Sequence, residues 1–246
     1  MNLLAEITPT RNFSLAYIIL DSIFIILFCS LLFYKKRYAT LIWSILGGIL
    51  YFIVDYGYFH WISHSRMITY CGNSSEAITF WVLLWMSLSY GITNFAFIWL
   101  ALKKDTHLKE WLLLIIMWWL IAPTIASFDQ THPVMTYRTT NQYHFVMAVI
   151  LIIGYLGLIV YNIVTKNKKA PIFQLLAIGI SVQFAWEFSL LINQIRPWNT
   201  ASLQTIILNS LIETNLGLPY MYLIYITFSK YFTEDLKKQT AMKELS

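Results

Sequence analysis

Seven long apolar runs follow one another along the chain, separated by short polar segments. Each run is close to the ~20 residues that a helix needs to cross the hydrocarbon core of a bilayer. The pattern therefore predicts seven transmembrane helices, at about 14–34, 39–62, 79–102, 111–127, 143–164, 171–193 and 202–228. The fourth of these runs is the shortest and contains Pro123.

The composition supports this interpretation. Hydrophobic residues make up 58% of the chain and charged residues 12%, whereas soluble domains carry roughly 25% charged residues. We therefore expect an all-α polytopic membrane protein with one seven-helix domain at 1–230, followed by a cytoplasmic tail at 231–246.

The basic residues are distributed unevenly between the two sets of connecting segments. One side holds Arg11, Arg66, Arg138 and Arg196. The other side holds Lys35, Lys36, Arg37, Lys103, Lys104, Lys109, Lys166, Lys168, Lys169, Lys230, Lys237, Lys238 and Lys243. The positive-inside rule then predicts an extracellular N-terminus and a cytoplasmic C-terminus, in the cytoplasmic (inner or plasma) membrane. This asymmetry explains the net charge of +5, so we expect no nucleic-acid partner.

Two segments of the chain resemble each other. In each segment a basic turn is followed by an apolar run and then a carboxylate, which is Asp55 in the first segment and Glu187 in the second. The helix after each carboxylate also contains a similar stretch, which begins at Ser87 in the first segment and at Ser210 in the second. This indicates two parallel half-repeats, 1–105 and 143–230, joined by a linking helix at 111–127. Chance similarity between apolar segments is the alternative explanation.

Three carboxylates lie within apolar runs that contain no Lys or Arg: Asp55, Glu187 and Glu213. An acid in hydrocarbon without a cation beside it ionises only at high cost, so we expect these three to be protonated near neutral pH. At 1.5 Å per residue, Asp55, Glu187 and Asp21 lie about 10 Å from the outer ends of their helices, and Glu213 about 17 Å. The sequence therefore predicts a shared acidic pocket beneath the outer surface.

Polar and aromatic residues accompany the acids at helical spacing. They could line a substrate pocket, in which aromatic faces stabilise a cation. Interhelical hydrogen bonds and interfacial packing are the alternative. The predicted lining residues are Tyr51, Tyr58, Trp85, Tyr90, Asn94, Gln183, Trp186, Asn209, Asn215 and Tyr220.

His60 and His64 are spaced i, i+4 at the outer end of the second run, and His132 and His144 belong to the same side. With Asp129 or Glu76 they could hold a metal, although interfacial histidines satisfied by water or backbone explain the same pattern. We expect no cofactor. The chain has no Gly-rich phosphate loop, no CxxC, no GxSxG and no lysine in the seventh run for a retinal Schiff base.

Three stretches carry a resemblance to a known family: KKRYA, FIVDYGY with Asp55, and LIETNLGLPYMY with Glu213. They resemble the small seven-helix integral-membrane terpene cyclases of fungal meroterpenoid and indole-diterpene pathways and their bacterial relatives. The resemblance implies that Asp55 and Glu213 are the acids that protonate the substrate. The chain departs from the family in having Val54 before Asp55, where the family has Trp before Glu; the Trp-Glu pair occurs instead at Glu187.

Several functions remain open. The first is an enzyme that cyclises an isoprenoid by general acid catalysis from Asp55, Glu187 or Glu213, with a lipophilic substrate and membrane lipids as partners. The second is a proton- or cation-coupled transporter with three helices, one linking helix and three helices. A binding or sensory module and a metal-dependent lipid hydrolase are further alternatives. The sequence does not define the substrate or the oligomeric state.

Overall fold

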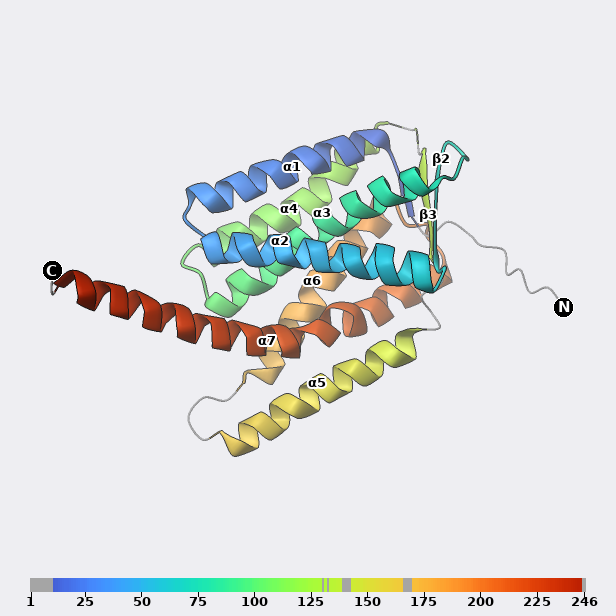
Figure 1. Ribbon diagram of the computed structural model, residues 1–246. Coiled ribbons are helices and arrows are strands. Elements are labelled where there is room, and N and C mark those ends of the chain that lie inside the picture. Colours follow the sequence, from blue (N-terminus) through green and yellow to red (C-terminus); the bar gives the residue numbers. More distant parts are fainter. Residues whose placement is uncertain (1–10, 130, 132, 139–142, 166–169, 245–246) are drawn as a thin grey trace.

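The computed structural model describes residues 11–129, 131, 133–138, 143–165 and 170–244. In these residues the chain forms seven helices, if α2 and the π-helix η1 that continues it are counted as one (Figure 1). The helices are α1 (Leu15–Tyr34), α2 (Tyr38–Phe52), η1 (Ile53–Ile62), α3 (Glu76–Lys103), α4 (Leu108–Ala126), α5 (His144–Val164), α6 (Ile172–Ile192) and α7 (Thr200–Glu244).

Six of these helices, α1 to α6 with η1 included in the second, are long and apolar enough to cross a membrane. Their outward surfaces carry large apolar side chains. On α1, for example, Ile26 and Leu27 are 65% and 63% exposed. Such a surface is unfavourable in water and favourable against lipid chains. The prediction of a helical membrane protein is confirmed at this level.

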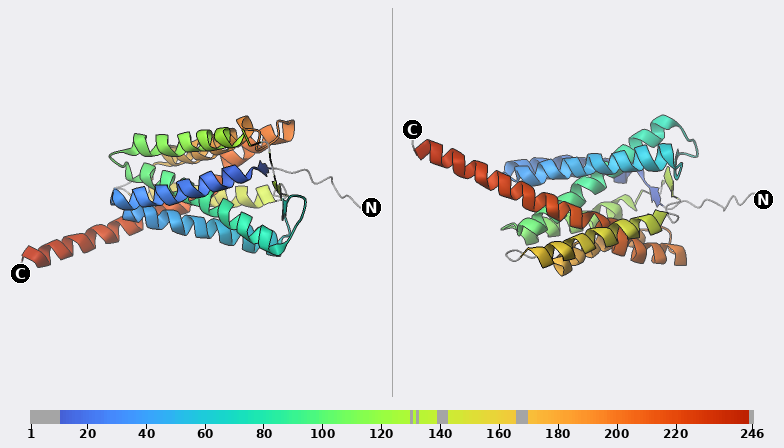
Figure 2. Two further views of the ribbon diagram at one scale, coloured as in Figure 1. Left: turned by 90° about the horizontal axis from the view of Figure 1, so that it is seen from above. Right: turned by 60° about the horizontal axis from the view of Figure 1, so that its bottom comes forward.

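The last helix is longer than the sequence pattern predicts. Instead of ending near residue 228, α7 continues to Glu244, so the tail at 231–246 is largely an extension of the same helix. Figures 1 and 2 show α7 projecting beyond the bundle at the end opposite the sheet. The tail's side chains and residues 245–246 lie outside the described residues.

A three-stranded antiparallel sheet closes the end of the bundle at which α3 and α5 begin (Figure 1). Its order is β1-β3-β2, with β1 at Arg11–Phe13, β2 at Arg66–Tyr70 and β3 at Val134–Arg138. The backbone N–H of Asn12 also donates to the carbonyl of Ile195, which ties the connection before α7 to the sheet. The sequence analysis missed this sheet because three to five residues are too few to show a strand period.

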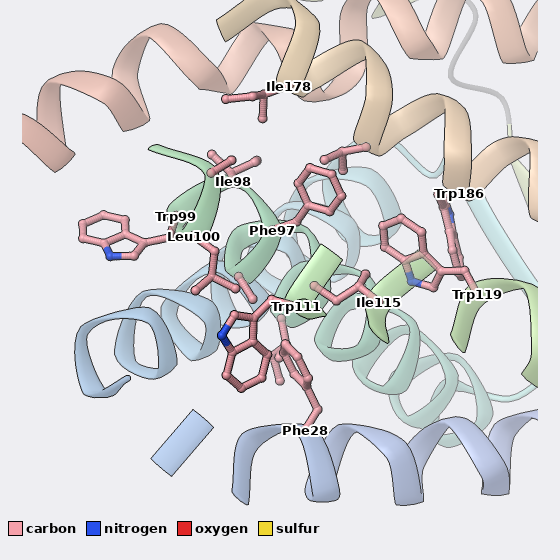
Figure 3. Close-up of a cluster of buried hydrophobic side chains, with 14 of the residues drawn as sticks. Phe28, Phe97, Ile98, Trp99, Leu100, Trp111, Ile115, Trp119, Ile178 and Trp186 are labelled. Carbon is pink, nitrogen blue, oxygen red and sulfur yellow. The ribbon is translucent and has the colours of Figure 1, made fainter. Parts of the chain in front are cut away.

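The helices pack on small residues and on a belt of large aromatic side chains. Where α2 crosses α3, a Cβ added to Gly91 would lie 2.5 Å from the Cα of Gly48, so the two backbones touch. Deeper in the bundle, Trp119 of α4 packs against Trp186 of α6 with ring centroids 5.6 Å apart (Figure 3). This core is continuous from α1 to α7 and holds the polar groups described next.

Candidate functional site

The sheet carries three arginine side chains on one face. Arg66 on β2 is the direct cross-strand partner of Arg138 on β3, and Arg11 on β1 pairs with Thr136, two residues before Arg138. Because alternate residues of a strand share a face, Arg11, Arg66 and Arg138 lie on the same side. Arg11 and Arg66 are each only 6% exposed, so this face is turned toward the helices.

Glu187 on α6 is fully buried and surrounded by donors. Arg11 Nη2 donates to its Oε1 at 3.1 Å, and Arg196 Nη2 donates to its Oε2 at 2.6 Å. Asn209 Nδ2 of α7 adds a third hydrogen bond to Oε1 at 3.0 Å. Both carboxylate oxygens are therefore occupied, and the carboxylate links the sheet, the connection after α6 and α7.

Asp55 lies in η1, the π-helical continuation of α2. Arg66 donates to its Oδ1 from both Nε, at 3.2 Å, and Nη2, at 3.0 Å. The guanidinium also stacks over the ring of Phe59, with 4.3 Å from its central carbon to the ring centroid, in a cation–π contact. A π-helical turn within an α-helix frequently marks a functional position, and here it presents Asp55 to the arginines.

Glu213 on α7 has the loosest arginine contact of the three acids. Its Oε2 accepts a hydrogen bond of 3.0 Å from Gln183 Nε2, and the Oε1 of Gln183 accepts from Tyr90 and from Thr214. The nearest cation is Arg138, whose Nη2 lies 3.7 Å from Glu213 Oε1. This distance is too long for a hydrogen bond, so Oε1 has no hydrogen-bond donor among the described residues.

The prediction that these acids lack a cation partner is wrong. Each of the three carboxylates lies beside an arginine supplied by a strand or connection outside the spanning helices. The reason for expecting protonated acids therefore fails. The sequence did hold a signal for these partners, because all four cations on the outer side are arginine and none is lysine. Arginine is the residue preferred for buried ion pairs.

Burial and charge change the pKa values of the sheet arginines. Burial lowers the pKa of Arg11, and the same effect, together with nearby Arg138, lowers that of Arg66 to about 10. For Arg138 burial acts downward too, but the negative charges of Glu213, Asp55 and Glu187 outweigh it and the pKa rises. Arginine keeps its charge in proteins, so the three guanidinium groups are treated as cations.

A cavity of about 270 Å³ lies directly below this charged cluster. Arg11, Arg138, Asp55 and Glu213 form its charged end, and aromatic and aliphatic side chains form most of its wall. Some of the lining residues are themselves on the outer surface of the bundle: Leu50 of α2, Val54 of η1 and Gly217 of α7. The cavity therefore reaches the lipid-facing surface between α2 and α7.

The structure brings together most of the predicted site. Tyr51, Trp85, Tyr90 and Trp186 line the cavity with two of the acids, and Tyr90 stacks obliquely on Tyr51 and on Trp186. Glu187, Gln183 and Asn209 lie behind this wall. Gln183 is hydrogen-bonded to Tyr90 and Glu213, which line the cavity. Glu187 is hydrogen-bonded to Arg11, which also lines it, and to Asn209.

Besides Gln183 and Asn209, four further predicted lining residues do not line the cavity. Asn94 is buried in α3, while Asn215 packs against Gly179 and bonds to the backbone of α7. Tyr58 and Tyr220 lie on the outer surface. Tyr220 donates to the carbonyl of Ile150, which joins α7 to α5.

The candidate histidines are dispersed. His60 contacts the carboxylate of Glu76 at 3.1 Å, and Tyr56 and Trp61 donate to the same carboxylate. His64 occupies a turn with positive φ. Within the described residues there is no cluster of three or more His, Cys, Asp or Glu side chains that could hold a metal. His132 lies outside the described residues.

A fourth acid, Asp21 of α1, is buried next to the cavity wall. Its two oxygens accept hydrogen bonds from the indole N–H groups of Trp85, at 3.0 Å, and Trp118, at 3.1 Å. Trp85 thus donates its indole N–H to this acid and also lines the cavity. Its rotamer is therefore fixed by α1.

No protein-family model, curated protein or solved structure matches the chain. The function is therefore argued from the geometry of the cavity and its acids.

Proposed function

We propose that this chain is an integral-membrane enzyme that cyclises a lipophilic isoprenoid by general acid catalysis. The observation that carries the proposal is a mostly apolar cavity that opens toward lipid between α2 and α7 and ends in two carboxylates. A lipid-soluble substrate could enter it from the bilayer without crossing water. We expect the chain to reside in the cytoplasmic membrane with its N-terminus outside.

Of the three acids, Asp55 and Glu213 suit the chemistry best. Both line the cavity, and each has one carboxylate oxygen without a hydrogen bond to a described residue, Asp55 Oδ2 and Glu213 Oε1. Glu187 is enclosed by donors and does not line the cavity. In the proposed mechanism Glu187 is a positioning residue that holds Arg11 and Arg196, not a catalytic one.

The proposed reaction needs no oxidant or reductant. Glu213 takes up a proton before turnover and donates it from Oε1 to a carbon–carbon double bond or an epoxide of the substrate. The resulting cation is attacked by an internal double bond, which forms the ring. Asp55 then removes a proton from the cyclic cation, which gives a neutral product with the same formula as the substrate. Trp85, Trp186 and Tyr90 line the cavity and can stabilise the cation with their ring faces.

The experiment is an assay of purified full-length chain in nanodiscs against linear polyprenyl compounds and their terminal epoxides. Mass spectrometry should detect a product of unchanged mass with a new retention time. Glu213→Gln should lower the rate by about 10²–10⁴-fold, as expected for loss of a general acid. Glu110→Gln is the matched control, because that carboxylate is 71% exposed at the other end of the bundle.

Two results would overturn the proposal. One is the absence of product from every substrate, when the protein is monodisperse and shows a cooperative thermal unfolding transition. The other is full activity in the Glu213→Gln variant.

A proton- or cation-coupled transporter is the second candidate. One observation favours it: α2 packs along α3 and α6 along α7, in the order expected of two parallel half-repeats. The ion pairs beneath the sheet would then form an outer gate. Proteoliposomes that take up a cationic solute in response to a proton gradient would support this function. Uptake unchanged after neutralisation of Asp55, Glu187 and Glu213 together would exclude a role for these acids.

A further inference from the structure

Arg138 is the guanidinium group with the fewest partners in the cluster. It ends β3 and lines the cavity with a side chain only 16% exposed. Its one close acidic contact, with Glu213, is 3.7 Å long, and its side chain makes no hydrogen bond to any described residue. Its Nε is buried without a partner. Because a buried donor without an acceptor costs free energy, this group is suited to an acceptor that enters the cavity.

Arg11 supplies a second donor at the same end of the cavity. One of its terminal nitrogens is bonded to Glu187, but its Nε is also buried without a partner. Arg11 and Arg138 reach the cavity from neighbouring strands on the same face of the sheet. Two planar guanidinium groups arranged in this way are suited to the paired oxygens of a carboxylate or phosphate group.

The charges of the cluster indicate what kind of anion fits. Four guanidinium groups, from Arg11, Arg66, Arg138 and Arg196, lie around the carboxylates of Asp55, Glu187 and Glu213. In the resting site, before Glu213 takes up the proton used in turnover, the three carboxylates count as anions and one positive charge is in excess. Arg66 and Arg138 are moreover direct cross-strand partners, an arrangement in which like charges repel. One negative charge in the cavity would balance the cluster, whereas a diphosphate would exceed it.

The remaining wall indicates what is attached to the anion. Phe13, Trp85 and Met86 line the cavity, and its outer end lies between Leu50 of α2 and Gly217 of α7. A Cβ added to Gly217 would meet no atom within 4 Å, so the space beside it is open. An apolar chain attached to the bound anion could therefore leave the cavity along α7 toward the lipid.

We propose that the cavity binds an amphiphile with a single negative oxyanion, a carboxylate or a phosphodiester, on Arg138 and Arg11, with its apolar chain between α2 and α7. This deepens the proposed function, because it gives the lipophilic substrate an anionic end. It rests on that function only in treating the cavity as the substrate site.

Calorimetry on the purified full-length chain in neutral detergent tests the proposal. The probes are geranylgeranoic acid, its methyl ester, a lysophosphatidylglycerol, and acetate and inorganic phosphate as free anions. We expect the acid or the phosphodiester to bind at least tenfold more tightly than the ester, since a hydrogen bond to a charged group is lost in the ester. The more tightly bound of the two identifies the class of head group.

Variants assign this preference to the arginine. Arg138→Gln should weaken binding of the anionic probe about tenfold or more and leave binding of the ester unchanged. Retained ester binding shows that the variant is folded, and Arg138→Lys should recover part of the anion affinity. Lys109→Gln is the control, because it removes one positive charge from an exposed position at the start of α4.

The possible outcomes separate this inference from the proposed function. Equal affinity for the acid and the ester, equal weakening of both by Arg138→Gln, binding of the free anions alone, or binding of none of the probes would each overturn it. Binding is measured without turnover. Tight, Arg138-dependent binding without any cyclised product would therefore leave the inference standing and remove the enzyme.

Discussion

The buried carboxylates of this chain join elements that are far apart in the sequence. Glu187 receives hydrogen bonds from Arg11, 176 residues away, from Arg196 and from Asn209. A buried ion pair contributes little net stability compared with apolar packing, but removing one partner leaves an uncompensated charge in a medium of low dielectric constant. The fold therefore depends on each member of the cluster even where that member performs no chemistry.

Glu187→Gln should strongly destabilise the protein, because Arg11 and Arg196 would keep their charges and lose the only carboxylate to which either donates a hydrogen bond among the described residues. The expected loss is about 3–5 kcal/mol of unfolding free energy. Thermal or denaturant unfolding of the full chain in detergent measures it. In the control Glu110→Gln the ion pair is exposed, so no measurable change is expected. Equal stabilities of the two variants would contradict a structural role for Glu187.

At the scale of the elements, the short connections contribute as much to the site as the helices. The strands β1, β2 and β3 bring three arginines to the end of the cavity, and η1 presents Asp55 to one of them. Close packing of the long helices fixes the positions of these parts. The contact between Gly48 and Gly91 holds α2, and with it η1, against α3.

Gly91→Ala should therefore destabilise the bundle. Its Cβ would lie 2.5 Å from the Cα and 2.8 Å from the backbone nitrogen of Gly48, and backbone atoms cannot move aside as a flexible side chain can. Overpacking of this kind costs about 1–3 kcal/mol, measurable as a lower unfolding midpoint. Gly157→Ala on α5 is the matched control, because its Cβ would meet nothing within 4 Å. A Gly91→Ala variant as stable as this control would refute the close approach of α2 and α3.

At the scale of the whole molecule, the charges at the two ends differ in kind. At the sheet end the arginines are buried against carboxylates. At the other end Lys103, Lys104 and Lys109 are exposed. Lys and Arg in short loops favour the cytoplasmic side of the membrane, and most of the basic residues lie at this second end. The predicted orientation thus places the sheet outside and the projecting end of α7 in the cytoplasm.

Labelling with a membrane-impermeant maleimide tests this orientation. Cys71, which follows β2 at the sheet end, is exposed. In a Cys29→Ser background it should react in intact cells. A single cysteine introduced by Thr106→Cys, in the exposed turn between α3 and α4, with Cys29→Ser and Cys71→Ser, should react only after lysis. The reverse pattern would place the sheet in the cytoplasm.

The sequence by itself determined the helices and the choice of the acids. Apolar runs of nearly constant length predict spanning helices, because a bilayer leaves few other ways to satisfy the backbone. A carboxylate within such a run is rare because placing it in hydrocarbon costs free energy. Asp55, Glu187 and Glu213 could therefore be selected before the fold was known. Their spacing along the helices also indicated that they lie at similar depths, and the structure gathers all three in one cluster.

Only the tertiary structure decided what surrounds those acids. Arg11, Arg66, Arg138 and Arg196 lie in connecting segments, and no local pattern shows that these segments fold back into the bundle and pair with carboxylates up to 176 residues away. The charge state of a buried acid depends on such contacts in space. For this reason the sequence selected acids that the fold brings together but gave the wrong electrostatic environment for them.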